Sequence, residues 1–149
     1  MSAINEWFGY YNAIFSYIRD TWGEEELERY LSHIAKEAYS DVIPQYREGG
    51  LSAIAERYVT NFCKDGDANS AKYSIKDEEL TIDIRCPAYT HSTEAAHPAR
   101  EIGDFFCSCC EKLNGQILEN AEHSLCVCRG ENGACIWKIK KIETKADEQ

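Results

Sequence analysis

The hydrophobic residues of this 149-residue chain follow two different periods, and the change between them limits the fold more than any other feature. Up to about residue 66 they recur at the three- and four-residue spacing of amphipathic helices. From Tyr73 to Ile84 they alternate, as in a strand with one buried face. A helical half followed by strands is typical of an α+β domain.

Three helices are predicted in the first half. The first spans Asn5 to Arg19, the second lies within residues 21–41, and the third runs from Leu51 to Cys63 after a break at Gly49-Gly50. The first helix carries an aromatic stripe, which we interpret as a core face or as the face of a homodimer. The same stripe could instead wall an apolar ligand pocket.

The second half is predicted to contain a hairpin, a helix and a second hairpin. The first hairpin turns at Lys76–Glu78, and Gly115 is expected to end a helix that starts near Ala99. The last strands, Ser124–Arg129 and Cys135–Lys140, are joined through an Asn-Gly turn. We therefore predict one domain over residues 1–149, with a helical part (1–66), a part with a mostly antiparallel four-stranded sheet packed with helices (71–142), and a polar tail (143–149).

The charge of the chain excludes some partners. Its formal net charge is −10, and its basic residues are scattered, whereas binding to a nucleic-acid backbone needs clustered Lys and Arg. No apolar run is long enough for a membrane span or for a secretory leader. We therefore expect a cytoplasmic protein with reduced thiols, no nucleic-acid partner and no membrane partner.

Cysteines are concentrated near the end of the chain, where six of the eight lie between Cys107 and Cys135. On a helix, Cys109 shares one side with Phe105, Phe106 and Leu113, which predicts a core position. Cys107 and Cys110 lie one turn apart on the shoulder of that helix, and such a pair could hold one ion.

The register of the last hairpin decides which of its cysteines lie together. If Cys128 pairs with Cys135, then Cys126, Cys128 and Cys135 share one face. If Arg129 pairs with Cys135, then Cys135 moves to the face of Val127, because a slip of one residue reverses every side chain. The length of the turn permits either arrangement.

Five soft donors within a short stretch make zinc the leading cofactor. The predicted ligands are Cys107, Cys110, His123, Cys126 and Cys135. An iron–sulfur cluster on the four cysteines of this set is also chemically allowed. The alternative is a group of buried thiols with one surface histidine.

A second candidate site follows the first hairpin. Cys86 and His91 could act as nucleophile and base, because an imidazole stabilises a thiolate and can carry its proton. The alternative is a buried, structural Cys86. We expect Tyr11, Tyr89 and Trp137 to line a ligand pocket.

The stretches IDIRCPAY, GDFFCSCC and LCVCRGENGACIWKI resemble the L-2-amino-thiazoline-4-carboxylic acid hydrolase-like family. In that family a Cys-Pro after a strand, a Phe-Cys helix and a final strand beginning with cysteine recur after a helical first half. The helix opening in TWGEEELERYL is similar to that family's as well. This resemblance implies a hydrolase that acts on a small sulfur- or nitrogen-containing compound.

The second half also resembles the 4-vinyl reductase domain, a small-molecule-binding and sensor fold. That resemblance implies zinc held by Cys107 or Cys110, by Cys126 and by Cys135. The chain departs from this pattern in two ways. His123 stands where the pattern has a carboxylate, and the turn is one residue longer. It implies a non-catalytic ligand-binding module with a structural zinc–thiolate site, as the alternative to the hydrolase.

Overall fold

The computed structural model describes residues 3–87, 89 and 104–143, with residues 3–8 as backbone only. The chain forms an α+β fold in which a helical half precedes a four-stranded antiparallel sheet, as predicted. The elements are α1 (Ala3–Trp22), α2 (Glu24–Glu37), α3 (Val42–Asp65), β1 (Ala71–Lys76), β2 (Glu79–Arg85), α5 (Asp104–Asn120), β3 (His123–Arg129) and β4 (Ala134–Lys141).

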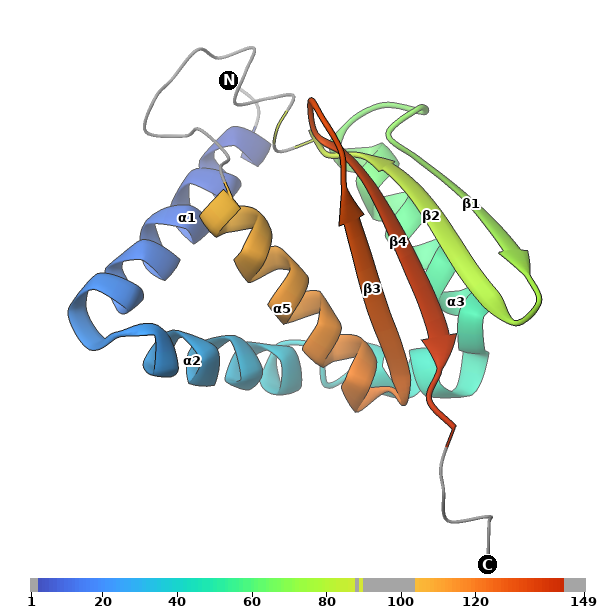
Figure 1. Cartoon of the computed structure of the whole chain (residues 1–149), viewed down its shortest axis with the longest axis horizontal. Helices are drawn as coiled ribbons and strands as arrows, with labels where there is room; N and C mark the ends of the chain where they lie inside the picture. The colour runs from blue at the N-terminus through green and yellow to red at the C-terminus, as the bar shows by residue number, and fades with distance from the viewer. Residues whose placement is uncertain (1–2, 88, 90–103, 144–149) are drawn as a thin grey trace, which may run out of the picture.

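The sheet has the strand order β1-β2-β4-β3, so the two hairpins meet through the pairing of β2 with β4. Figure 1 shows α3 behind the strands and α1, α2 and α5 as three sides of a triangle beside them. In the β3–β4 hairpin, Arg129 pairs with Cys135. The second of the two registers is therefore correct, and Cys135 lies on the face of Val127 and Trp137.

Helix α5 lies between two groups of buried side chains. Phe106 and Cys109 pack with Phe15, Leu27 and Leu31 of the first two helices. Ile117 and Leu118 pack with the sheet and with α3. Because α5 buries side chains toward both neighbours, a cysteine on this helix can enter either environment.

The predicted break at Gly49-Gly50 is confirmed, because Gly50 has φ 67° and ψ −155° and divides α3 into two helical segments, the second of which follows from Leu51. The first segment, which begins at Val42, was not predicted as a helix; Pro44 lies in its first turn, where a missing N–H removes no helical hydrogen bond. One predicted helix boundary was wrong. Gly115 does not end α5, which continues to Asn120. Pro98 and residues 99–103 lie outside the described residues.

None of the helices in the described ranges is both long and apolar enough to cross a membrane.

Candidate functional site

A cavity of about 210 Å³ opens where α5, the end of β2 and the turn between β3 and β4 meet. Four cysteines from three separate segments line it: Cys86, Cys107, Cys110 and Cys135. We call this space the cysteine cavity. Much of its remaining wall is apolar, and its large side chains are Phe62, Ile84, Tyr89, Phe106, Val127 and Trp137.

The segment after β2 is fixed against the last turn by its backbone. The Cys86 N–H donates to the Gly133 carbonyl at 2.9 Å. The ring of Tyr89 lies directly over Gly133, where an added Cβ would come within 2.8 Å of that ring. Gly133 has φ +80°, so glycine meets both a conformational and a steric need here. These contacts hold Cys86 beside the hairpin that carries Cys135.

The four thiols are close enough to influence one another's ionisation. Burial, together with the charges that Cys86, Cys107 and Cys135 would carry, raises the pKa of Cys110 to about 12. Burial also raises the pKa of Cys135, against which a hydrogen bond with Trp137 acts. Without a cation in the cavity, Cys110 and Cys135 are therefore neutral thiols at physiological pH.

Charged side chains of the cysteine cavity are concentrated around Arg129. Its guanidinium lies 3.6 Å from a Glu111 carboxylate oxygen and 3.9 Å from one of Asp104. Because all three side chains are substantially exposed, these ion pairs contribute little to stability. They do place both signs of charge along an otherwise mainly apolar cavity.

The structure separates the predicted zinc ligands. Cys107, Cys110 and Cys135 line the cysteine cavity, but Cys126 is exposed on the opposite face of the sheet. His123 is 2% exposed at the start of β3 and does not line the cavity either. Cys109 is 2% exposed in the core, as predicted for this member of the triplet.

The other predicted site residues are also divided. Cys86, Tyr89 and Trp137 line the cysteine cavity. Tyr11 does not; its ring stacks on Phe15 of the same helix. His91, the expected base, lies outside the described residues.

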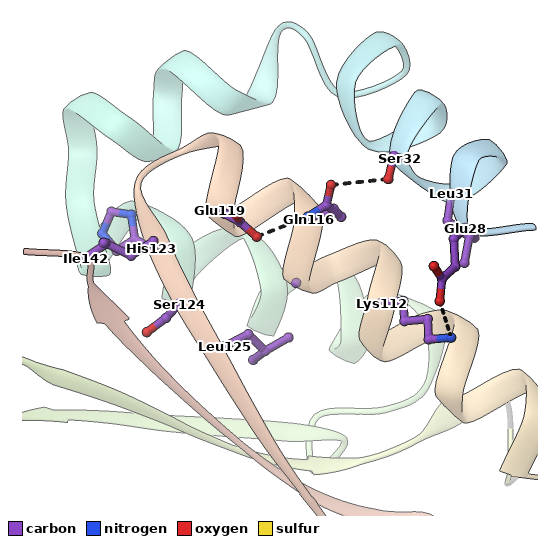
Figure 2. A pocket seen from close by; sticks show the side chains of 11 residues that line it. Glu28, Leu31, Ser32, Lys112, Gln116, Glu119, His123, Ser124, Leu125 and Ile142 are labelled. Atoms are coloured by element: carbon purple, nitrogen blue, oxygen red, sulfur yellow. Dashed lines mark hydrogen bonds and ion pairs between the residues drawn. The ribbon is translucent and has the colours of Figure 1, made fainter. Parts of the chain in front are cut away.

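A larger hollow of about 490 Å³ lies between α2, α5 and the start of β3, and its polar side chains are largely bonded to one another. Figure 2 shows Lys112 paired with Glu28 at 3.3 Å and Gln116 joined to Ser32 at 3.3 Å. The His123 Nδ1–H donates to the Ala121 carbonyl at 2.8 Å. These contacts join α2 to α5 and already occupy most polar groups of the hollow. The cysteine cavity is therefore the stronger candidate site.

The four thiols fit zinc by chemistry, because thiolate sulfur is among its preferred ligands. All eight cysteines lie in the described part of the chain, and none forms a disulfide there. Within residues 3–87, 89 and 104–143, however, no three Cys, His, Asp or Glu side chains lie in an arrangement that could hold a metal ion. A bound ion would therefore have to draw these thiols together.

Several residues around the cavity were missed by the sequence reasoning. Arg129 and Phe62 carry no motif, and only the tertiary fold brings them to the cysteines. Asn114 had a signal, because it lies one helical turn after Cys110 and shares its side of α5. Cys86 was predicted as a nucleophile and not as a neighbour of the other thiols.

No protein-family model, curated protein or solved structure matches the chain.

Proposed function

We propose that the protein binds a small, mainly apolar molecule in the cysteine cavity, beside a zinc ion held by Cys86, Cys107, Cys110 and Cys135. The observation that carries this proposal is the convergence of four thiols from three segments on one cavity with aromatic walls. Three of these ligands, Cys107, Cys110 and Cys135, were predicted from the sequence. Cys86 takes the place of His123 and Cys126, which lie elsewhere.

The number of ligands favours binding over turnover. Four thiolates would complete the tetrahedral coordination of zinc and leave no position for an activated water. The ion would then link the end of β2, helix α5 and the β3–β4 hairpin. The cavity is smaller than the roughly 300–1,000 Å³ of pockets for drug-sized ligands. Its ligand is therefore small, for instance a single substituted ring lying against Trp137.

Metal analysis of single variants tests the ligand set. We expect one equivalent of zinc in protein purified without oxygen, and its loss in Cys86→Ser and Cys135→Ser. Cys126→Ser and Cys128→Ser are matched controls on the exposed face of β3 and should keep the metal. Unaltered protein that takes up no zinc, or Cys86→Ser protein that keeps it at full affinity, contradicts the proposed centre.

A titration with phenol, followed by tryptophan fluorescence, tests the binding of a small aromatic molecule. Trp137 lies in the cavity wall and is expected to report a saturable change. Val127→Phe should fill the cavity and abolish that change. Ile136→Phe adds the same ring on the opposite face of the sheet and should leave it intact. Equal responses of these two variants would count against this pocket.

A hydrolase is the second candidate function, and the position of Cys86 in the cavity favours it. In this version the Cys86 thiolate is the nucleophile, and the substrate is a small sulfur- or nitrogen-containing compound. L-2-amino-thiazoline-4-carboxylic acid is the first compound to test, because of the sequence resemblance. Turnover that Cys86→Ser abolishes while Cys107→Ser spares it would favour this candidate over the zinc-linked binder.

A further inference from the structure

A series of partly buried hydrogen bonds leads from Tyr58 of α3 to one sulfur of the cysteine cavity. The Tyr58 hydroxyl donates to Asn114 Oδ1 at 2.9 Å. Asn114 Nδ2 donates to the Cys110 carbonyl at 2.8 Å and to Cys110 Sγ at 3.4 Å. One amide group therefore joins the tyrosine of α3 to a thiol of the proposed centre.

The orientation of this amide is fixed by its surroundings. If the Asn114 side chain were flipped, its oxygen would face the Cys110 carbonyl oxygen at the same short distance, and both atoms would be acceptors. The nitrogen must therefore face Cys110, where it lies 3.4 Å from the sulfur as well as 2.8 Å from the carbonyl oxygen. The Tyr58 ring is held in place by Trp137, which packs edge-on against it with 5.1 Å between the ring centroids.

The hydrogen bonds from Tyr58 to Asn114 and from Asn114 to Cys110 run in the same direction, and this strengthens the second of them. The Tyr58 hydroxyl gives its single proton to Asn114, and the Tyr46 ring packs beside Tyr58. Successive donors in a shielded interior polarise one another. Both tyrosines are buried, with exposed fractions of 3% for Tyr46 and 9% for Tyr58. The Asn114 N–H is thereby a stronger donor than an isolated amide.

A neutral thiol is a poor acceptor, whereas a thiolate accepts an N–H strongly. We propose that Asn114 is a positioning residue of the cysteine cavity: its amide N–H holds the Cys110 sulfur and stabilises it as a metal-bound thiolate, with Tyr58 locking the amide. This inference rests on the proposed zinc centre. Partners in this outer position orient metal ligands and tune them.

Cobalt substitution gives a test with a spectroscopic readout. Protein purified without oxygen is loaded with Co²⁺, and the sulfur-to-cobalt charge-transfer band is recorded for Asn114→Leu. Loss of the N–H raises the electron density on sulfur, so the band should move to longer wavelength. Zinc affinity, measured by competition with a chelator, should fall by roughly 10- to 100-fold.

Two further variants separate positioning from general packing. Tyr58→Phe keeps the amide and loses only the hydroxyl, so it should shift the band in the same direction by a smaller amount. Gln116→Leu removes another amide of α5, one that bonds to Ser32 and Glu119 away from the cysteines, and it should change neither readout. If Asn114→Leu does not fold, Tyr58→Phe carries the test alone.

The outcomes distinguish the two proposals. Unaltered protein that binds neither Co²⁺ nor Zn²⁺ overturns the zinc centre, and with it this inference. A different result overturns the role of Asn114 alone. In that case the unaltered protein binds both ions, and Asn114→Leu and Tyr58→Phe have the same charge-transfer band and the same zinc affinity as the unaltered protein.

Discussion

At the scale of single residues, the three neighbouring cysteines of α5 have different surroundings. Cys109 is 2% exposed among Phe15, Leu27 and Phe106, away from the cavity that Cys107 and Cys110 line. Burial raises the pKa of the Cys109 thiol to about 11, which keeps it neutral. It acts as a small hydrophobic residue between helices.

Cys109→Ser should therefore lower the free energy of unfolding without changing metal content. A hydroxyl placed in this apolar environment without a partner costs about 1–3 kcal/mol. Urea unfolding of the variant measures the loss. Cys128→Ser, on the exposed face of β3, is the control and should stay within about 0.5 kcal/mol of the unaltered protein. A stable Cys109→Ser protein would show that this position tolerates a polar group.

Gly133→Ala should destabilise the turn that supports the cysteine cavity. A non-glycine residue at φ +80° costs about 1–2 kcal/mol, and the new Cβ would also collide with the Tyr89 ring. Thermal unfolding measures the total effect. The double variant with Tyr89→Gly relieves the collision, because it removes both the ring and the Tyr89 Cβ, which would lie 2.9 Å from the new methyl group. If the double variant loses as much stability as the two single variants together, the Tyr89 side chain does not press on this glycine.

At this scale the sequence predicted the core position of Cys109, because helical spacing placed it with Phe106. It could not place Cys135. Its face depends on a register that differs by one residue between the two alternatives, and the turn sequence allows both. In the structure, pairing of Arg129 with Cys135 brings that thiol to the inner face of the sheet.

At the scale of elements, a substitution near the end of α5 should stabilise the protein, whereas the preceding two should destabilise it. Gly115 lies inside the helix, and an added Cβ would meet nothing within 4 Å. Gly115→Ala should therefore stabilise the protein by roughly 0.5–1 kcal/mol, because glycine loses more backbone freedom than alanine in a helix. Chemical unfolding gives the sign. A destabilised variant would mean that the helix ends near Gly115, as its sequence had suggested.

Glycine is an ambiguous signal at the level of elements. The pair at Gly49 and Gly50 was expected to break the chain, and Gly50 does interrupt the helical geometry, with φ 67°. Gly115 was expected to do the same and does not, because packing of Ile117 and Leu118 against the sheet extends α5 beyond it. Tertiary burial decides between these outcomes, and local sequence does not contain it.

At the scale of the whole molecule, the buried tyrosines predict a loss of stability in alkali. Burial raises the pKa of Tyr46 from 10.0 to about 12. Below pH 10 the folded and unfolded chains both keep this proton. Between pH 10 and pH 12 the unfolded chain releases it first, so the free energy of unfolding falls as the pH rises.

Tyr46→Phe should flatten this dependence, because the variant has no hydroxyl proton to lose at that position. Urea unfolding from neutral pH to pH 12 measures the slope. Tyr10→Phe is the control, since the Tyr10 side chain is 65% exposed, and it should keep the slope of the unaltered protein. Equal slopes for the two variants would mean that Tyr46 ionises alike in both states.

The α+β fold itself was predictable, because each element shows its period locally. The composition of the candidate site was not. Cys86 reaches Cys135 only because β2 pairs with β4, and Phe62 reaches them from α3. These are contacts between distant parts of the sequence, and helical or alternating patterns carry no information about which elements meet.

The strand order β1-β2-β4-β3 also has a kinetic consequence. Each hairpin joins strands that are neighbours in the chain, whereas the central β2–β4 pairing closes a loop that contains α5 and β3. The entropy of closing that long loop has to be overcome before the pairing contributes. We therefore expect the β2–β4 pairing, which brings Cys86 and Cys135 together, to form late in folding. A soft metal ion bound between these thiols would then slow unfolding.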